Sequence, residues 1–330
     1  MKKFLVFLLM SLVVSSLSIA QKKSDEASDY QSKTFTAQKS GLLTVDVEPG
    51  SVRIESSSKD EVTVEAEGID ERHPDRLVMT QSGNNVTVKY RDSRHNVEHL
   101  VFTIMVPSQY NVDIQTSGGS IKQRDVLTGN FQAETKGGSI EIDHIIGKVD
   151  VETGGGSIKV EKIEGDAKMQ TGGGSIETGT VTGTLSARTG GGSIHVRGAK
   201  YGIKVRTGGG GIEMEDITGV VNASTGGGSI VCELTPGERG NSSITTGGGE
   251  IQLTLPENAK CIVEATINAG HGWGKHHKKY SIHSDFKADK YEGDQEGGEI
   301  HAVYSLNGGG PTITLETSES DIDIKKMSAK

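Results

Sequence analysis

T-G-G-G-S-I at residues 153–158 recurs along the middle of this 330-residue chain and decides its fold. Close variants of the phrase end at eight isoleucines: Ile121, Ile140, Ile158, Ile176, Ile194, Ile212, Ile230 and Ile251. Successive isoleucines are 19, 18, 18, 18, 18, 18 and 21 residues apart. So regular a period indicates that each unit is one supersecondary element stacked on the next.

The unit from Ile158 to Ser175 shows how one repeat folds. Its apolar residues are the isoleucine itself and the residues two, five, nine and eleven positions later, and neighbouring units repeat this pattern. Alternation with a period of two on each side of a turn predicts two strands. The glycine seven positions after the isoleucine marks the first bend and the glycine run marks the second.

Stacking equivalent strands from successive units gives parallel ladders around one interior, whereas separate hairpins would leave exposed edges in every unit. The sequence therefore predicts an all-β protein, a parallel β-solenoid of about eight 18-residue, two-strand rungs with an N-terminal β capping region. Eight rungs spaced by ~4.8 Å would make a rod roughly 40 Å long.

Charges directly after the isoleucines support this register. They alternate along the repeats: Lys122, Glu141, Lys159, Glu177, His195 and Glu213. Opposite charges on neighbouring strands stabilise pairing by roughly 0.2–1 kcal/mol. We interpret this row as register control, because a binding stripe would more often carry a single sign.

A threonine precedes each of the eight isoleucines by five positions, from Thr116 to Thr246. The row is either a stacked hydroxyl ladder beside the glycine bend or a flat array of the ice-binding kind. A single file of threonines beside glycines forms no two-dimensional lattice, so we favour the structural ladder.

The flanking regions set the domain organisation. Residues 1–20 have the features of a signal peptide: Lys2 and Lys3, an apolar stretch, and Ser18-Ile19-Ala20 before the cleavage point. We expect a flexible leader at 21–32, an N-terminal β region at 33–112, solenoid repeats at 113–255, and C-terminal rungs at 256–330. The signal predicts export to the periplasm, cell surface or medium, with no membrane span in the mature chain.

The net charge limits the classes of partner, and the two cysteines raise the question of a disulfide. The formal charge is −9 and becomes −11 without the two signal lysines, which argues against a nucleic-acid partner. Cys232 and Cys261 are the only cysteines, and export would let a disulfide persist. They either bridge the two walls of the solenoid or serve as two small buried apolar residues.

The chain resembles a known family in several segments: Val106-Pro107 closing the N-terminal strands, the repeated glycine turns, Leu253-Thr254-Leu255-Pro256, and Gly308-Gly309-Gly310. This is the bacterial putative adhesin domain family of unknown function, and the resemblance covers roughly residues 33–325. It implies a solenoid-like β fold at the cell envelope and supplies no catalytic residues. A histidine-rich insertion at 270–280 is no part of the family pattern.

That insertion, G-H-G-W-G-K-H-H-K-K-Y, is the segment richest in ligand chemistry. Imidazoles of His271, His276 and His277 could hold a divalent transition metal. Trp273 with Lys275, Lys278 and Lys279 suggests instead a loop that binds a glycan or an anionic partner. A solvated loop without a ligand is the simplest interpretation of the same residues.

The sequence lacks the motifs that other kinds of site would require. The glycine turns are followed by Ser-Ile and not by the aspartates of calcium-binding repeats, and acidic residues are dispersed or next to lysines. We therefore expect no cofactor and a non-enzymatic, adhesin-like binding or scaffold module whose partner is an envelope component, glycan or protein. The alternatives are a carbohydrate-active β-helix enzyme and a self-assembling structural scaffold.

Overall fold

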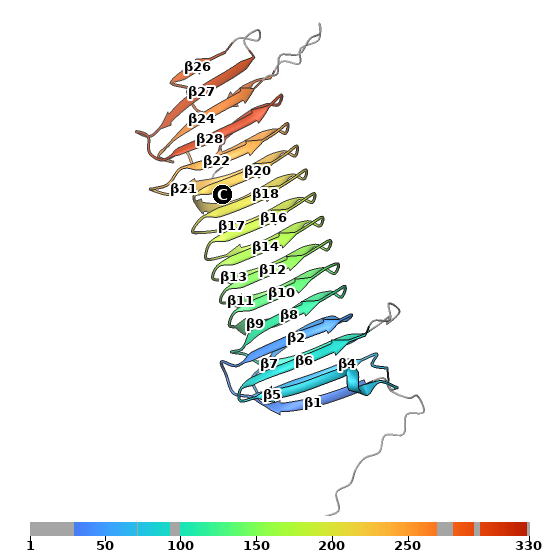
Figure 1. Ribbon diagram of the computed structural model, residues 1–330. Coiled ribbons are helices and arrows are strands. Elements are labelled where there is room, and N and C mark those ends of the chain that lie inside the picture. Colours follow the sequence, from blue (N-terminus) through green and yellow to red (C-terminus); the bar gives the residue numbers. More distant parts are fainter. Residues whose placement is uncertain (1–29, 71, 93–99, 269–279, 294–297, 329–330) are drawn as a thin grey trace, which may run out of the picture.

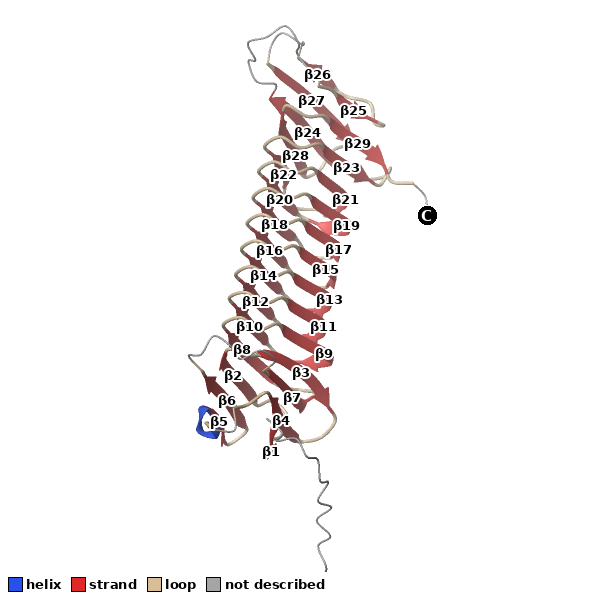
Figure 2. Ribbon diagram, turned by 90° about the vertical axis from the view of Figure 1, so that its right-hand side faces the viewer, coloured by secondary structure: helices blue, strands red, loops and turns tan. Residues whose placement is uncertain are grey.

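The structure, a computed structural model, describes residues 30–70, 72–92, 100–268, 280–293 and 298–328. Two long β-sheets face each other along a rod, and from β7 to β24 the chain passes from one to the other at every turn (Figures 1 and 2). Within the described ranges there is no α-helix and a single 3-10 turn, Pro74–Arg76. The predicted all-β parallel solenoid is confirmed.

Sheet A contains the strands that begin at the repeated isoleucines. In spatial order its strands are β1 (Tyr30–Thr36), β4 (Glu61–Glu67), β7 (Val101–Pro107), β3 (Ser51–Ser57), β9 (Ile121–Thr128), β11 (Ile140–Ile146), β13 (Ile158–Glu164), β15 (Ile176–Val181), β17 (Ile194–Ala199), β19 (Ile212–Gly219), β21 (Ile230–Pro236), β23 (Ile251–Leu255), β29 (Ile322–Lys326) and β25 (Ile282–Ser284). All eight repeat isoleucines open a strand here, and each pairs with the isoleucine of the next rung.

Sheet B contains the returning strands. In spatial order its strands are β5 (Leu77–Ser82), β6 (Asn85–Arg91), β2 (Leu42–Glu48), β8 (Asn111–Thr116), β10 (Phe131–Thr135), β12 (Val149–Thr153), β14 (Ala167–Thr171), β16 (Leu185–Thr189), β18 (Ile203–Thr207), β20 (Val221–Thr225), β22 (Ser242–Thr246), β28 (Thr312–Ser318), β24 (Cys261–Asn268), β27 (Glu299–Leu306) and β26 (Lys290–Glu292). Parallel pairing runs without interruption from β6 to β24.

The interior is a thin layer of branched apolar side chains between the sheets. In the rung that starts at Ile158, all five predicted apolar positions are at least 95% buried: Ile158, Val160, Ile163, Ala167 and Met169. Burying one isoleucine or valine side chain contributes about 1.5–3 kcal/mol. The core therefore extends along the rod axis, which explains how a chain with few aromatic residues can fold.

Departures from the 18-residue period have local causes. In β9, Asp125 adopts a φ of 66° and the register to β11 shifts beside it, so one extra residue bulges out of the ladder. This bulge accounts for the 19-residue spacing. A similar bulge in β19 involves Asp216, with a φ of 48°. The 21-residue spacing includes the longer connection between β21 and β22.

Each glycine turn is held by the threonine that precedes it. The Thr171 hydroxyl donates to the carbonyl oxygen of Gly156 in the previous rung (2.7 Å) and accepts from the Gly174 amide (3.3 Å). The same pair of bonds recurs at Thr153, Thr189, Thr207 and Thr225. All eight repeat threonines are buried, which agrees with the structural ladder and not with an exposed ice-binding array.

Both ends of the rod finish in strands that leave the simple chain order. At the N-terminal end β6 and β7 lie outside β2 and β3, and the antiparallel strands β5, β4 and β1 complete the cap. At the C-terminal end β28 inserts between β22 and β24, and β29 between β23 and β25. Strand β1 begins at Tyr30, so Tyr30–Ser32, predicted to lie in the leader, pair with β4 instead.

The two cysteines are free and buried. Cys232 lies on β21 in sheet A, whereas Cys261 opens β24 in sheet B. Strand β24 lies two ladder steps beyond β22, which follows β21 in the chain, so the cysteines are separated by roughly 10 Å along the axis alone. A disulfide requires Cα atoms closer than about 7 Å. The disulfide interpretation therefore fails, and both thiols serve as small core residues.

Candidate functional site

The predicted ligand residues of the insertion lie outside the described residues. His271, His276, His277, Trp273, Lys275, Lys278 and Lys279 all fall in the segment between Asn268, at the end of β24, and Tyr280. Their roles remain predictions. Elsewhere, in the ranges that are described, no three histidine, cysteine, aspartate or glutamate side chains gather as a metal site. No helix of the described chain is long and apolar enough to cross a membrane.

The outer face of sheet A carries a row of charges that alternate in sign. The predicted row of alternating charges forms as expected, strand by strand. Lys122 Nζ lies 3.2 Å from Glu141 Oε2, and His195 Nδ1 lies 3.0 Å from Glu213 Oε2. Because positive and negative groups alternate, this row carries little net charge from β9 to β15.

Two carboxylates of the sheet A side are held ionised. Glu164 accepts from Lys162 Nζ (2.6 Å) and contacts His144 Nε2 (3.1 Å), and the hydrogen bond from Lys162 is the largest cause of its lowered pKa. Asp166 accepts from the Thr184 hydroxyl (2.7 Å) and amide (2.8 Å), and these bonds lower its pKa. A glycosidase acid needs a raised pKa, so neither carboxylate suits that role.

The outer face of sheet B, here called the B face, is built differently. Each of its central strands exposes two side chains, and these form two parallel rows across the sheet. From β8 to β22 the first row is Asp113, Gln132, Asp150, Lys168, Ser186, Lys204, Asn222 and Ser243. The second row is Gln115, Glu134, Glu152, Gln170, Arg188, Arg206, Ser224 and Thr245.

Charge on the B face is segregated along the rod. Four acidic residues, the acidic segment, lie together on β8, β10 and β12: Asp113, Glu134, Asp150 and Glu152. Four basic residues, the basic segment, follow on β14, β16 and β18: Lys168, Arg188, Lys204 and Arg206. Uncharged polar groups follow on β20 and β22: Asn222, Ser224, Ser243 and Thr245. A single-signed stripe of this kind is typical of a binding surface.

Two arginines of the basic segment face each other without a carboxylate between them. Arg188 on β16 is the direct partner of Arg206 on β18, and both side chains are exposed. Among the described residues neither arginine makes an ion pair, and the same holds for Lys204. Like charges opposite each other destabilise a ladder. The strand pairing therefore carries a cost here that an anionic ligand would offset.

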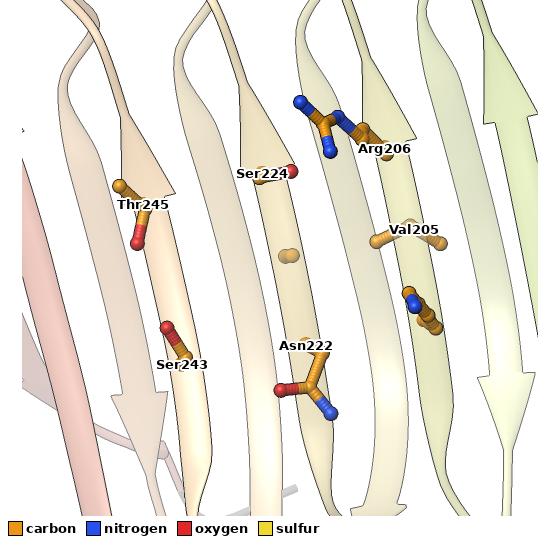
Figure 3. Close-up of a pocket in the computed structure, with 8 residues that line it drawn as sticks. Val205, Arg206, Asn222, Ser224, Ser243 and Thr245 are labelled. Carbon is orange, nitrogen blue, oxygen red and sulfur yellow. The ribbon is translucent and has the colours of Figure 1, made fainter.

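A shallow hollow lies beside this arginine pair. About 460 Å³ of open space is bounded by Arg188, Arg206 and Ser224 together with the adjoining threonine–glycine turns. A second hollow next to it is lined by polar groups of β18, β20 and β22. Figure 3 shows Arg206, Ser224 and Thr245 in one row on adjacent strands, with Asn222 and Ser243 in the other. Arg206 and Ser224 line both hollows, so guanidinium and hydroxyl donors lie along this part of the B face, here called the track.

The carboxylates of the acidic segment also repel one another. Burial raises the pKa of Asp113, and the negative charge of Glu134 raises it further. Asp113 Oδ1 is buried and has no hydrogen-bond partner in the part of the chain that is described. Glu134 faces Glu152 directly on the next strand. One contact joins the two segments, since Lys168 Nζ lies 3.1 Å from Asp150 Oδ1.

An exposed aromatic residue flanks the basic segment. Tyr201 lies in the turn that leads into β18, three residues before Lys204, and is 75% exposed. Tyrosine offers a flat apolar ring with a hydroxyl at its tip, a combination that suits stacking against a sugar ring. The turn thus places an aromatic group at the edge of the cationic track.

The segregated charges occupy repeat positions other than the one directly after each isoleucine. The position after each isoleucine lies on sheet A, where signs alternate. The informative positions lie ten and twelve residues after the isoleucine, where Lys204 and Arg206 follow Ile194. Reading these two positions from rung to rung would have revealed the segregated charge, because the unit length is constant there.

Residues 42–205 match the model of the Toastrack DUF4097 family. The matched segment begins with β2 and ends within β18, so it contains the whole acidic segment and most of the basic one. No curated protein matches the chain.

Several crystal structures match most of this chain. A putative adhesin from Bacteroides fragilis is 12% identical with a TM-score of 0.35, and the match covers 92% of this chain and 98% of the other. A putative adhesin from Parabacteroides distasonis is 13% identical with a TM-score of 0.43, covering 90% and 97%. A putative lipid binding protein from the same organism is 11% identical with a TM-score of 0.34, covering 91% and 97%. Likeness at this level carries no argument about what this chain binds.

Proposed function

We propose that this chain, whose residues 42–205 form a Toastrack DUF4097 domain, is an exported, non-enzymatic binding protein of the cell envelope. Its ligand is an anionic polysaccharide that lies along the B face across the basic segment. The observation that carries this proposal is the unpaired arginine pair, Arg188 opposite Arg206, within a stripe of one sign. The repeats supply the rigid support and the B face supplies the specificity.

The shape of the surface favours a polymer over a small molecule. The basic groups are spread over β14, β16 and β18, and neighbouring strands in a sheet are ~4.8 Å apart. A flat, open track touches successive groups of an extended chain, whereas a small ligand is usually enclosed in a pocket. Hydroxyl and amide groups of β20 and β22 extend the track with donors and acceptors suited to sugar hydroxyls.

Local charge outweighs the net charge of the molecule in this proposal. The chain as a whole is acidic, so an anionic polymer is repelled at long range. At the surface, however, charges more than a Debye length apart, about 8 Å at physiological salt, are largely screened from each other. Lys168 pairs with Asp150, so the unpaired Arg188, Lys204 and Arg206 act as a local positive site whose affinity falls as salt rises.

Binding of a carboxylated glycan tests the proposal. The chain from Gln21 onward is titrated against polygalacturonate, with neutral dextran as the control polymer. We expect Arg188→Gln/Arg206→Gln to weaken binding at least tenfold. The matched variant Arg124→Gln/Arg197→Gln removes the same charge from sheet A, where both arginines pair with carboxylates. It should change the affinity less than twofold.

Three results would count against the proposal. Equal losses in the two double variants would mean that bulk charge alone drives association. Unchanged binding in the Arg188 and Arg206 variant would place the ligand elsewhere, for example on the insertion. Stronger binding of duplex DNA than of the glycan, with the same dependence on Arg188, would assign the surface to nucleic acid.

A further inference from the structure

We infer that the B face also docks a second copy of this chain, face to face and with the two rods antiparallel. This goes beyond the proposed function, because it assigns a role to the acidic segment and a competitor to the polysaccharide. It rests on the order of charges along the B face. When a second copy runs in the opposite direction, its basic segment lies opposite the acidic segment of the first copy. Figure 1 shows the strands that carry these charges stacked in a regular ladder.

A two-fold axis parallel to the strands, placed between β12 and β14, describes the arrangement. The rotation turns one B face onto the other and reverses the direction of the rod. It brings β8 opposite β18, β10 opposite β16, and β12 opposite β14 of the second copy. Residues of the first row face the first row, and residues of the second row face the second.

The charges then meet in opposite pairs. Asp113 faces Lys204 of the second copy, and Asp150 faces Lys168 of the second copy. Glu134 faces Arg188 of the second copy. Each of these three pairs occurs twice by symmetry. Of the other positions, two set a charged group against an uncharged one and the third sets Gln132 against Ser186, so no two like charges oppose each other within these six strands.

Arrangements in which the two-fold axis lies on a strand are less favourable. Moving the axis onto β12 places Asp150 against Asp150 of the second copy, and moving it onto β14 places Lys168 against Lys168. A parallel arrangement of the rods exchanges the two rows, so Lys204 faces Arg206 of the second copy. Juxtaposed like charges suppress wrong pairings.

The same contacts would relieve the repulsion within one copy. Glu134 and Glu152 are direct neighbours on β10 and β12, as Arg188 and Arg206 are on β16 and β18. In the dimer, Glu134 and Arg188 neutralise each other across the interface. Two costs that the monomer carries therefore decrease together.

The expected dimer is weak and sensitive to salt. Six strands of five residues cover roughly 30 × 16 Å on each copy, so about 1,000 Å² is buried in total. Stable interfaces usually bury about 1,200–2,000 Å². The contact is polar throughout, so screening by salt should dissolve it. It covers the basic segment, so an anionic polymer and a second copy cannot occupy the B face together.

Sedimentation equilibrium of the chain from Gln21 onward at 20 mM and 500 mM salt tests the inference. We expect a reversible dimer at low salt that dissociates at high salt. Glu134→Arg and Arg188→Glu should each raise the dimer dissociation constant at least tenfold. The double variant Glu134→Arg/Arg188→Glu should restore it to within threefold, because the two positions face each other only between copies. Three strand spacings separate them within one copy.

The control is Glu215→Arg, the same charge change on an exposed residue of sheet A, which should leave the dimer intact. A dimer that survives Glu134→Arg, or one that Glu215→Arg also dissolves, would overturn the inference. A chain that stays monomeric at 20 mM salt and high concentration would overturn it as well.

Failure of this inference is distinguishable from failure of the proposed function. The Glu134→Arg variant is expected to be monomeric and to bind polygalacturonate at least as tightly as the unmodified chain, because its basic segment is free. Glycan binding without a dimer would leave only the proposed function standing. A dimer rescued by the charge exchange, in a chain that binds no glycan, would leave only the interface standing.

Discussion

Arg188 and Arg206 occupy directly opposite positions on β16 and β18, and within the described part of the chain no carboxylate pairs with either. On the opposite wall the register instead sets Lys122 against Glu141. The same stacking principle thus produces a row of alternating charges on one face and segregated charges on the other. The difference lies in which outward positions of the repeat carry alternating signs.

Removing one charge of the Arg188–Arg206 pair should stabilise the monomer. We expect Arg188→Gln to raise the free energy of unfolding by about 0.5 kcal/mol at low salt, because it removes a like-charge neighbour. Urea denaturation at dilute concentration measures the change, and 0.5 M salt should reduce it. Arg197→Gln, which removes an ion pair with Glu177, should not stabilise the fold. A loss of more than 1 kcal/mol in Arg188→Gln would show that this arginine supports the fold.

Glycines within one turn should differ sharply in their tolerance of a methyl group. A Cβ on Gly156 would clash with the backbone carbonyl of Gly138 in the rung before, whereas a Cβ on Gly155 meets nothing within 4 Å. We expect Gly156→Ala to destabilise by more than ~2 kcal/mol and Gly155→Ala to stay within about 0.5 kcal/mol. Thermal unfolding followed by circular dichroism distinguishes the two. Equal effects would contradict the tight stacking at the third glycine of the turn.

The threonine ladder should matter through its hydroxyl. Thr171→Val keeps the shape but leaves the Gly174 amide without its acceptor and the Gly156 carbonyl without this donor. Leaving a buried polar group unsatisfied costs about 1–3 kcal/mol. The control Thr171→Ser keeps the hydroxyl and should lose less than half as much. The measurement is urea denaturation, and a neutral Thr171→Val would contradict a structural role for the row.

Both cysteines should be unreactive in the native protein. Burial raises the pKa of Cys232 to about 12 and that of Cys261 to about 11, from an ordinary value of 9.0. Since the thiolate is the nucleophile, we expect no modification by a maleimide at pH 7.5 without denaturant and two modified thiols after unfolding. Adding a reductant should leave the melting temperature unchanged. A reductant-dependent shift would indicate a disulfide.

The same shifts give a pH dependence with a definite sign. A folded-state pKa raised above the unfolded value contributes stability that is fully present below the unfolded pKa. That contribution decreases as pH rises from about 9 through the folded values of about 11 and 12. The double variant Cys232→Ala/Cys261→Ala should therefore lose less stability between pH 9 and 11 than the unmodified chain. Parallel curves would contradict burial of the thiols.

Asp113 should have opposite effects on the stability of the monomer and on dimer formation. Burial, followed by the charge of Glu134, raises its pKa, so its ionised form costs stability at neutral pH, and that cost disappears as pH falls through the raised pKa. Asp113→Asn should therefore stabilise the monomer at pH 7. It should also weaken the low-salt dimer, because Asp113 faces Lys204 of the second copy there. A stabilised variant with an unchanged dimer would exclude that pairing.

Much of the scaffold could be predicted from the chain because the repeat is local. Within one 18-residue unit, alternation of apolar residues around Ile158 and a glycine at Gly165 already determine two strands and two bends. Stacking follows because a single rung cannot bury its apolar face alone. The end caps were less predictable: β28 inserts between β22 and β24, and no periodic signal marks such long-range pairing.

By itself, then, the sequence determined the strands, the bends, the parallel stacking and the neutral row on sheet A, since each depends on residues within one or two repeat units. The tertiary structure alone decided which outward positions share a wall and in what order. That order brings Arg188 against Arg206, separates the acidic segment from the basic one, and keeps Cys232 and Cys261 apart. The physical reason is that charge–charge interactions and thiol separation depend on distance in space, which only the register of the assembled sheets defines.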